Sequence, residues 1–195
     1  MKNLVLLIFL LVSVKNFAQD YSLNKIAKIP DSIANFSELR IYLKPALTNS
    51  WQIFRMYQEK ENTTWKIELI KKSPDSIKQM EELNSQTNLD VVWLKILQSD
   101  ILYLPKWESI QYKFKKSKTI ELEEGKFIDN YSSVAIMDGI GYEVMIKNNK
   151  EFNKILYSNP EGYLKHFENI DELIAFKNLL DTIRNEFGIW KTNNK

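Results

Sequence analysis

The chain has 195 residues, of which 27 are basic and 25 acidic, with one histidine and no cysteine. The lack of cysteine excludes thiol catalysis, cysteine-ligated zinc and iron–sulfur clusters. A single histidine, His166, excludes three-histidine and HExxH metal sites within one chain. The sequence also contains no Walker A, GxGxxG or GxSxG motif. We therefore expect no metal and no cofactor, and we assign no catalytic residue.

Residues 1–18 have the pattern of a secretory signal peptide, with Lys2 before the apolar run 4–14 and a cleavage position after Ala18. The apolar run is too short to be assigned as a membrane span. We expect a periplasmic or secreted protein that does not span the membrane, with residues 19–195 as one domain. Removing the leader also removes Lys2 and Lys15, and with them the formal net charge of +2. Electrostatic capture of nucleic acid is therefore not expected.

The end of the leader, Phe17-Ala18-Gln19, and the many Lys, Asn and Ile residues resemble exported proteins of Bacteroidota. This resemblance covers the leader and the overall composition only. It implies a periplasmic or secreted location, and it implies no activity.

Alternating apolar and polar residues predict strands in the first half of the chain. A first strand is expected at 39–43. Segments 51–58 and 64–71 are rich in aromatic and β-branched residues and flank the polar break 59–63. They predict a hairpin.

A helical segment is expected over residues 75–104. Pro74 suits a helix start, and apolar residues from 94 to 104 are spaced by three and four before Pro105 ends the segment.

A further hairpin is expected between 110 and 122, with a turn at 116–118. Its first run carries lysines on the polar face and its second run carries glutamates, so these charges are expected to pair across the strands. The nearby glutamates argue against a nucleic-acid patch at 113–118. One more strand is expected around 133–137.

The C-terminal block predicts a hairpin and two helices. Residues 142–147 and 152–157 alternate on either side of an Asn-rich break, which indicates a hairpin. Asn159 before Pro160 predicts the start of a short helix. The last helix is expected over 169–187.

The helix at 169–187 carries the clearest local signal. Asn169 and Glu172 have the spacing of a capping box, and Gly188 is typical of a left-handed C-cap. Its apolar residues fall on one stripe: Leu173, Phe176, Leu179, Leu180, Ile183 and Phe187. The stripe is too short for a coiled coil and predicts a helix packed on the protein's own sheet. The expected fold is α+β, with an antiparallel sheet built of hairpins packed against a helical segment and a C-terminal helix.

Aromatic residues are the first candidates for ligand binding. Most lie at the strand spacing typical of core packing. Trp107 and Trp190 fall outside that periodicity. Together with Tyr142 and Tyr157, they are the candidate binding residues.

Carboxylate chemistry is the catalytic class that the composition leaves open. Asp138 and Glu143 are the candidate pair if the protein is an enzyme. Glu143 lies on a predicted strand, and a solvated acid on an open sheet face is the simpler interpretation.

The tetrapeptide Pro-Asp-Ser-Ile occurs at 30–33 and at 74–77. Two similar helix starts explain the repetition. The tetrapeptide also resembles the Asp-Ser/Thr-hydrophobic O-glycosylation sequon of Bacteroidota. That resemblance makes Ser32 and Ser76 candidate modification sites.

These observations predict an exported, non-catalytic binding or interaction module whose partner is a protein or a glycan. Two alternatives stay open. One is a small carboxylate-dependent hydrolase directed at glycans. The other is a carrier that holds an apolar ligand between sheet and helices.

Overall fold

The computed structural model describes residues 23–73 and 79–190. These residues fall into two compact units, one ending at Ala34 and the other beginning at Asn35. The leader expected at 1–18 lies outside the described residues.

In the first unit, residues 23–27 are helical. Asn24 donates a hydrogen bond from Nδ2 to Oδ1 of Asp31 at 2.8 Å, which ties the helix to the bend that follows it. No helix begins at Pro30 in this described segment, so that expectation is wrong.

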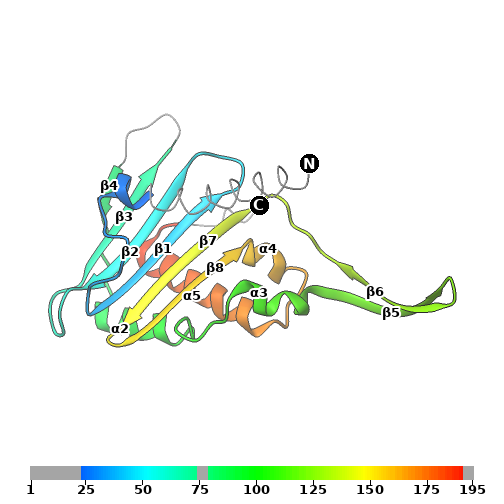
Figure 1. Ribbon diagram of the computed structural model, residues 1–195. Helices are drawn as coiled ribbons and strands as arrows, with labels where there is room; N and C mark the ends of the chain where they lie inside the picture. Colours follow the sequence, from blue (N-terminus) through cyan, green and yellow to red (C-terminus); the bar gives the residue numbers. More distant parts are fainter. Residues whose placement is uncertain (1–22, 74–78, 191–195) are drawn as a thin grey trace, which may run out of the picture. The chain divides into compact units, whose positions relative to one another are not determined.

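Within the described residues of the second unit, six antiparallel strands form one sheet and two more form a separate hairpin (Figure 1). The order across the larger sheet is β4-β3-β2-β1-β7-β8, so the C-terminal hairpin adds beside β1. The larger sheet consists of β1 Ser37–Pro45, β2 Trp51–Gln58, β3 Lys66–Lys72, β4 Gln79–Glu82, β7 Ile140–Asn148 and β8 Glu151–Ser158. The separate hairpin consists of β5 Lys115–Glu123 and β6 Lys126–Ser133.

The two hairpins expected at 51–71 and 142–157 are confirmed. β2 pairs with β3, and β7 pairs with β8. The second hairpin turns at Asn149, whose φ of 56° lies in the left-handed region that asparagine tolerates.

The helices lie against one face of the larger sheet (Figure 1). They are α2 Leu89–Leu97, α3 Trp107–Ile110, α4 Pro160–Leu164 and α5 Asp171–Phe187, and a 3₁₀ turn, η1, follows α3 at Gln111–Phe114. In the part of the chain that the structure describes, no helix combines the length and the apolar character needed to cross a membrane. The protein is thus α+β, as the sequence predicts.

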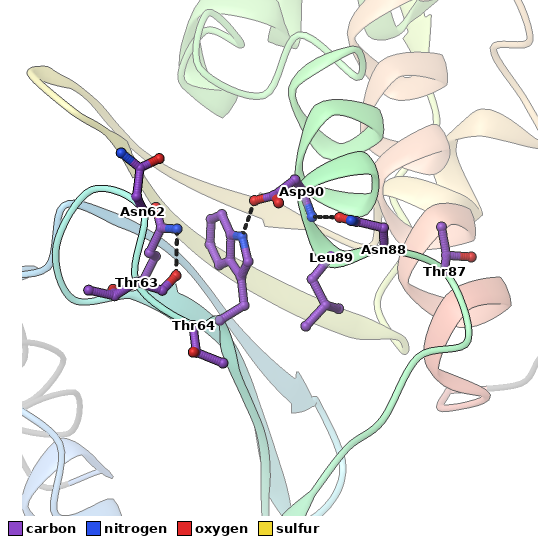
Figure 2. A pocket seen from close by; sticks show the side chains of 9 residues that line it. Asn62, Thr63, Thr64, Thr87, Asn88, Leu89 and Asp90 are labelled. Carbon is purple, nitrogen blue, oxygen red and sulfur yellow. Dashed lines mark hydrogen bonds between the residues drawn. The ribbon is translucent and has the colours of Figure 1, made fainter.

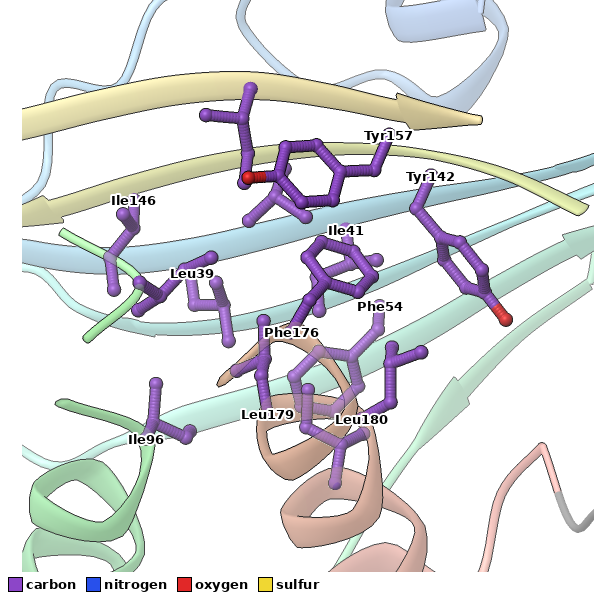
Figure 3. Close-up of a cluster of buried hydrophobic side chains, with 14 of the residues drawn as sticks. Leu39, Ile41, Phe54, Ile96, Tyr142, Ile146, Tyr157, Phe176, Leu179 and Leu180 are labelled. Carbon is purple, nitrogen blue, oxygen red and sulfur yellow. The ribbon is translucent and has the colours of Figure 1, made fainter. Parts of the chain in front are cut away.

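The core lies between α5 and the sheet. The predicted stripe of α5 is buried along its whole length. Phe176 stacks on Tyr157 with ring centroids 4.9 Å apart, and Leu179 and Leu180 point toward the strands beside it (Figure 3). Gly188 ends the helix at φ 66° and donates its N–H to the carbonyl of Arg184, which confirms the predicted C-cap.

The start of α5 differs from the predicted capping box. Ile170 occupies the N-cap position, and no side chain caps the helix there. Glu172 instead accepts hydrogen bonds from Nζ of Lys113, at 2.6 and 2.8 Å. An ion pair to a distant segment therefore replaces the local contact.

The helical segment expected at 75–104 is only partly correct. Residues 74–78 lie outside the described residues, and Gln79–Glu82 form strand β4 at the edge of the sheet, paired with β3. Hydrogen bonding to a neighbouring strand outweighs the local helix signal here. The helix begins later, at α2, where Asn88 acts as N-cap.

The hairpin expected between 110 and 122 is shifted along the chain. Residues 107–114 form α3 and η1, because Trp107, Ile110 and Phe114 point into the core at helical spacing. β5 then runs through the expected turn at 116–118, and the turn lies at Glu124 and Gly125. The strand expected at 133–137 lies earlier in the chain, because β6 ends at Ser133 and residues 134–137 form no strand.

Candidate functional site

A groove of about 530 Å³ lies between the loop that joins β2 to β3 and the start of α2. Figure 2 shows Asn62, Thr63 and Thr64 on one side of this groove and Asn88 and Asp90 on the other. We call it the Trp65 groove, and its lining residues are Gln58, Asn62, Thr63, Thr64, Trp65, Thr87, Asn88, Leu89 and Asp90.

The loop side of the Trp65 groove is held by short local hydrogen bonds. Thr63 donates from Oγ1 to the carbonyl of Lys60 at 2.7 Å, and Gln58 donates from Nε2 to the carbonyl of Thr63 at 2.7 Å. Asn62 adopts the left-handed conformation, with φ of 59°, which turns the chain toward β3. These bonds fix the backbone that presents the two threonines.

The helix side is held by the cap of α2. Oδ1 of Asn88 accepts a hydrogen bond from the backbone N–H of Asp90 at 2.8 Å, as an N-cap residue does. Because Asn88 caps the helix, the carboxylate of Asp90 is not needed as a cap and faces the groove. It accepts a hydrogen bond from Nε1 of Trp65 at 2.7 Å. This bond joins the two sides of the groove.

The indole of Trp65 also rests on a second indole. The ring centroids of Trp65 and Trp93 are 4.9 Å apart with planes tilted by 35°. Trp93 is buried and donates from Nε1 to Oδ1 of Asn148 at 3.2 Å. The half-buried ring of Trp65 is thus held at its edge by the hydrogen bond to Asp90 and on one face by the ring of Trp93.

Trp65 borders a second groove of about 310 Å³. This neighbouring groove lies along β3 and β4, and its lining includes Lys66, Glu68, Glu82 and Ser85. A ligand longer than one ring that binds at Trp65 has polar surface on both sides of the indole.

The Trp65 groove is lined mainly by polar side chains. Seven of its nine residues carry hydroxyl, amide or carboxylate groups, and the indole supplies an apolar face. Among the described residues, no group of three or more His, Asp and Glu side chains could hold a metal ion. The groove can donate and accept hydrogen bonds around a polar ligand and can stack against its apolar face.

The four aromatic residues singled out in the sequence do not line this groove. Trp107, Tyr142 and Tyr157 are buried in the core. Tyr157 donates its hydroxyl to the carbonyl of Pro105 at 3.0 Å, and burial raises its pKa. Packing in the core explains the positions of these three rings without a ligand.

Trp190 is half-buried at the end of α5. Its Nε1 donates to Oε1 of Gln52 at 2.8 Å, and its ring meets Phe54 edge to face with centroids 6.0 Å apart. The ring therefore fastens the C-terminal segment to β2, and this contact explains it without a ligand.

The candidate carboxylates Asp138 and Glu143 have different surroundings. Asp138 is exposed in the segment before β7. The side chain of Glu143 is 7% exposed and forms ion pairs with Lys44 at 3.5 Å and Lys154 at 2.8 Å. Glu143 was expected to be a solvated acid on an open sheet face. It is instead largely buried, and two lysines from neighbouring strands neutralise its charge. This is the environment of a structural ion pair.

The remaining candidates lie at the surface or outside the described part. Ser32 is exposed, whereas Ser76 lies outside the described residues. His166 is exposed after α4 and lines a groove of about 470 Å³ with Lys113 and Lys116.

Comparison of the chain with protein-family models, with curated proteins and with solved structures finds no match. The Trp65 groove was not predicted from the sequence, because its two sides lie more than twenty residues apart. Only the polar break at 59–63 and the Asn-Leu-Asp start of α2 at 88–90 signalled its two halves.

Proposed function

We propose that this protein is a non-catalytic binding protein that holds a saccharide in the Trp65 groove. The observation that carries the proposal is the Trp65 indole, fixed by Asp90 and Trp93 and surrounded by hydroxyl and amide side chains.

A saccharide has two kinds of surface, and the groove matches both. Its C–H face is apolar and stacks on an aromatic ring, and a ring that is already held in place loses little conformational entropy on binding. Its hydroxyl groups need donors and acceptors around the rim. Thr63, Thr64 and Asn88 supply such groups from elements that hydrogen bonds already fix.

The proposed location agrees with this ligand class. The leader pattern of residues 1–18 supports a periplasmic or secreted protein. Glycans are abundant outside the cytoplasm, and a small rigid domain that binds them needs no cofactor. The two lysines that neutralise Glu143 favour binding over carboxylate-based hydrolysis. The side chains that fill the space between sheet and helices favour it over an apolar carrier (Figure 3).

The experiment is a glycan array probed with the purified protein and with two variants. Trp65→Ala removes the stacking face and is expected to weaken binding to every captured glycan by about tenfold or more, which corresponds to about 1.4 kcal/mol. Tyr112→Ala removes an exposed ring on a different element and serves as the matched control, with binding unchanged.

The array separates the proposal from its alternatives. Glycan signals that survive Trp65→Ala would place the binding surface elsewhere. The absence of any signal would contradict a saccharide ligand, and shortening of the printed glycans would indicate a hydrolase.

A further inference from the structure

The Trp65 groove and the neighbouring groove along β3 and β4 adjoin each other. Trp65 and Leu89 line both of them. Apart from Gln58, every lining residue of the two grooves comes from two segments of the chain, residues 62–68 and 82–90. We call the two grooves together the Trp65 cleft.

The two segments pass along the Trp65 cleft in opposite directions. From the Trp65 groove into the neighbouring groove, the lining runs from Asn62 up to Glu68 on one segment and from Asp90 down to Glu82 on the other. The cleft therefore follows the two segments lengthwise. Trp65 lies where its two halves meet.

The loop between β4 and α2 lines the second half of the cleft and is fixed by hydrogen bonds. The backbone N–H of Leu83 donates to the carbonyl of Ile67 at 3.1 Å. Oγ of Ser85 accepts from the backbone N–H of Thr87 at 3.0 Å and donates to Oε2 of Glu186 on α5 at 3.4 Å. A ligand that binds along this loop therefore loses little free energy in ordering it.

Both halves of the cleft are large enough to hold part of a ligand. Their volumes of about 530 and 310 Å³ each fall within the range of about 300–1,000 Å³ that is typical of small-molecule sites. Exposed polar side chains occur in both halves, with Thr63 and Thr64 in the first and Glu82 and Asn84 in the second. A single sugar ring at Trp65 would leave part of this polar surface without a partner.

We infer that the ligand of the Trp65 groove is a linear oligosaccharide that crosses Trp65 and occupies both halves of the Trp65 cleft. This inference rests on the proposed saccharide function and adds the length of the ligand to it. One sugar ring stacks on the indole of Trp65. The rings that follow it along the chain lie over the second half of the cleft, where Asn84 offers an amide group.

The test is titration calorimetry of the full protein with oligosaccharides of increasing length. The series runs from the monosaccharide through the disaccharide and trisaccharide to longer oligomers of a glycan captured on the array. Affinity is expected to rise by about tenfold or more until the oligomer fills both halves, and then to stay constant. Rings beyond the cleft add no contact, so they add no affinity.

Asn84→Ala tests the second half of the cleft by itself. It is expected to weaken binding of the longer oligomers severalfold and to affect the monosaccharide least, because a single ring stacked on Trp65 does not fill the second half. Gln86→Ala is the matched control, with affinities unchanged. Gln86 is exposed on the same loop and lines neither groove.

The length series separates this inference from the saccharide proposal. Longer oligomers that bind no more tightly than the monosaccharide would overturn the inference alone, and so would an Asn84→Ala variant that binds them as the wild type does. The failure of every glycan to bind would contradict both the inference and the saccharide proposal.

Discussion

Nε of Arg55 on β2 donates a hydrogen bond of 2.7 Å to Oε1 of Glu38 on β1, and the Glu38 side chain is fully buried. Arg40, on the same strand as Glu38, donates to the same oxygen from Nε at 3.1 Å and from Nη2 at 2.6 Å. Two guanidinium groups that face each other across the strands therefore share one carboxylate. This cluster lies on the sheet face opposite the aliphatic core and links β1 to β2.

Glu38→Gln is expected to lower the free energy of unfolding by about 3–5 kcal/mol, because it removes the buried carboxylate that both arginines share and leaves Arg55 with only its longer ion pair to Glu68, at 3.4 Å. Chemical denaturation followed by tryptophan fluorescence measures the change. Glu81→Gln is the matched control, because it breaks an exposed ion pair with Lys71 and is expected to cost less than about 1 kcal/mol. Equal effects of the two substitutions would contradict the structural role of Glu38.

The same cluster predicts how stability depends on pH. Burial alone would raise the pKa of Glu38, but the hydrogen bond from Arg55 and the charges of Arg40 and Arg55 outweigh burial and hold it below the ordinary value. A carboxyl group with a lowered pKa in the folded state stabilises the protein above its unfolded pKa, and this contribution is lost as the pH falls through the folded pKa.

We therefore expect the free energy of unfolding to decline as the pH falls below about 4.3, the ordinary pKa of a glutamate. Denaturation curves between neutral and acidic pH measure this decline. It should be shallower in Glu38→Gln, and only in part abolished, because Glu172 and Glu186 also have lowered pKa values. Identical slopes in the wild type and the variant would contradict the assignment to Glu38.

The contact between α5 and the sheet predicts a second stability effect. Phe176 is fully buried between the rings of Tyr157 and Tyr142, so Phe176→Ala should cost about 3–5 kcal/mol. Leu180→Asp buries a charge without a partner and should prevent folding. Thermal unfolding measures both. Phe152→Ala, at a ring that is 54% exposed on β8, is expected to change stability by no more than about 0.5 kcal/mol.

The apolar pattern predicted this part of the fold because few alternatives match it. The apolar stripe from Leu173 to Phe187 lies on one side of a helix, so the helix buries it by packing on the sheet. The alternation of apolar residues in β7 and β8 puts them on the core face in one register of the hairpin. The errors fall where tertiary contacts outweigh local signals. Gln79–Glu82 form a strand because β3 offers an edge, and Glu172 leaves the capping box because Lys113 lies within reach.

The Trp65 groove was harder to predict for a related reason. Trp65 looks like any strand aromatic in the sequence, and its partners Asp90 and Trp93 follow 25 or more positions later. The contacts of Trp65 with Asp90 and Trp93 depend on the tertiary packing of α2, which the spacing of apolar residues in the sequence does not predict. Tyr142 and Tyr157 are buried, as the alternation of their strands allows, although the sequence had also made both of them candidate binding residues.

The bond between Trp65 and Asp90 predicts how the groove responds to small changes. Asp90→Asn keeps an oxygen that can accept from the indole, so we expect saccharide binding close to that of the wild type. Asp90→Ala removes the acceptor and frees the ring, and binding should weaken severalfold, because the ring must then be ordered on binding. Titration calorimetry with a glycan captured on the array measures both. Equal affinities of the two variants would show that the bond does not position the ring.

The most direct test of the saccharide proposal is a nuclear magnetic resonance titration of the indole N–H signals, of which the five tryptophans supply one each. Addition of a captured glycan is predicted to shift the Trp65 signal, while the signal of Trp190, bonded to Gln52, stays in place. A Trp65 signal that does not move while other signals shift would contradict the assignment of the groove.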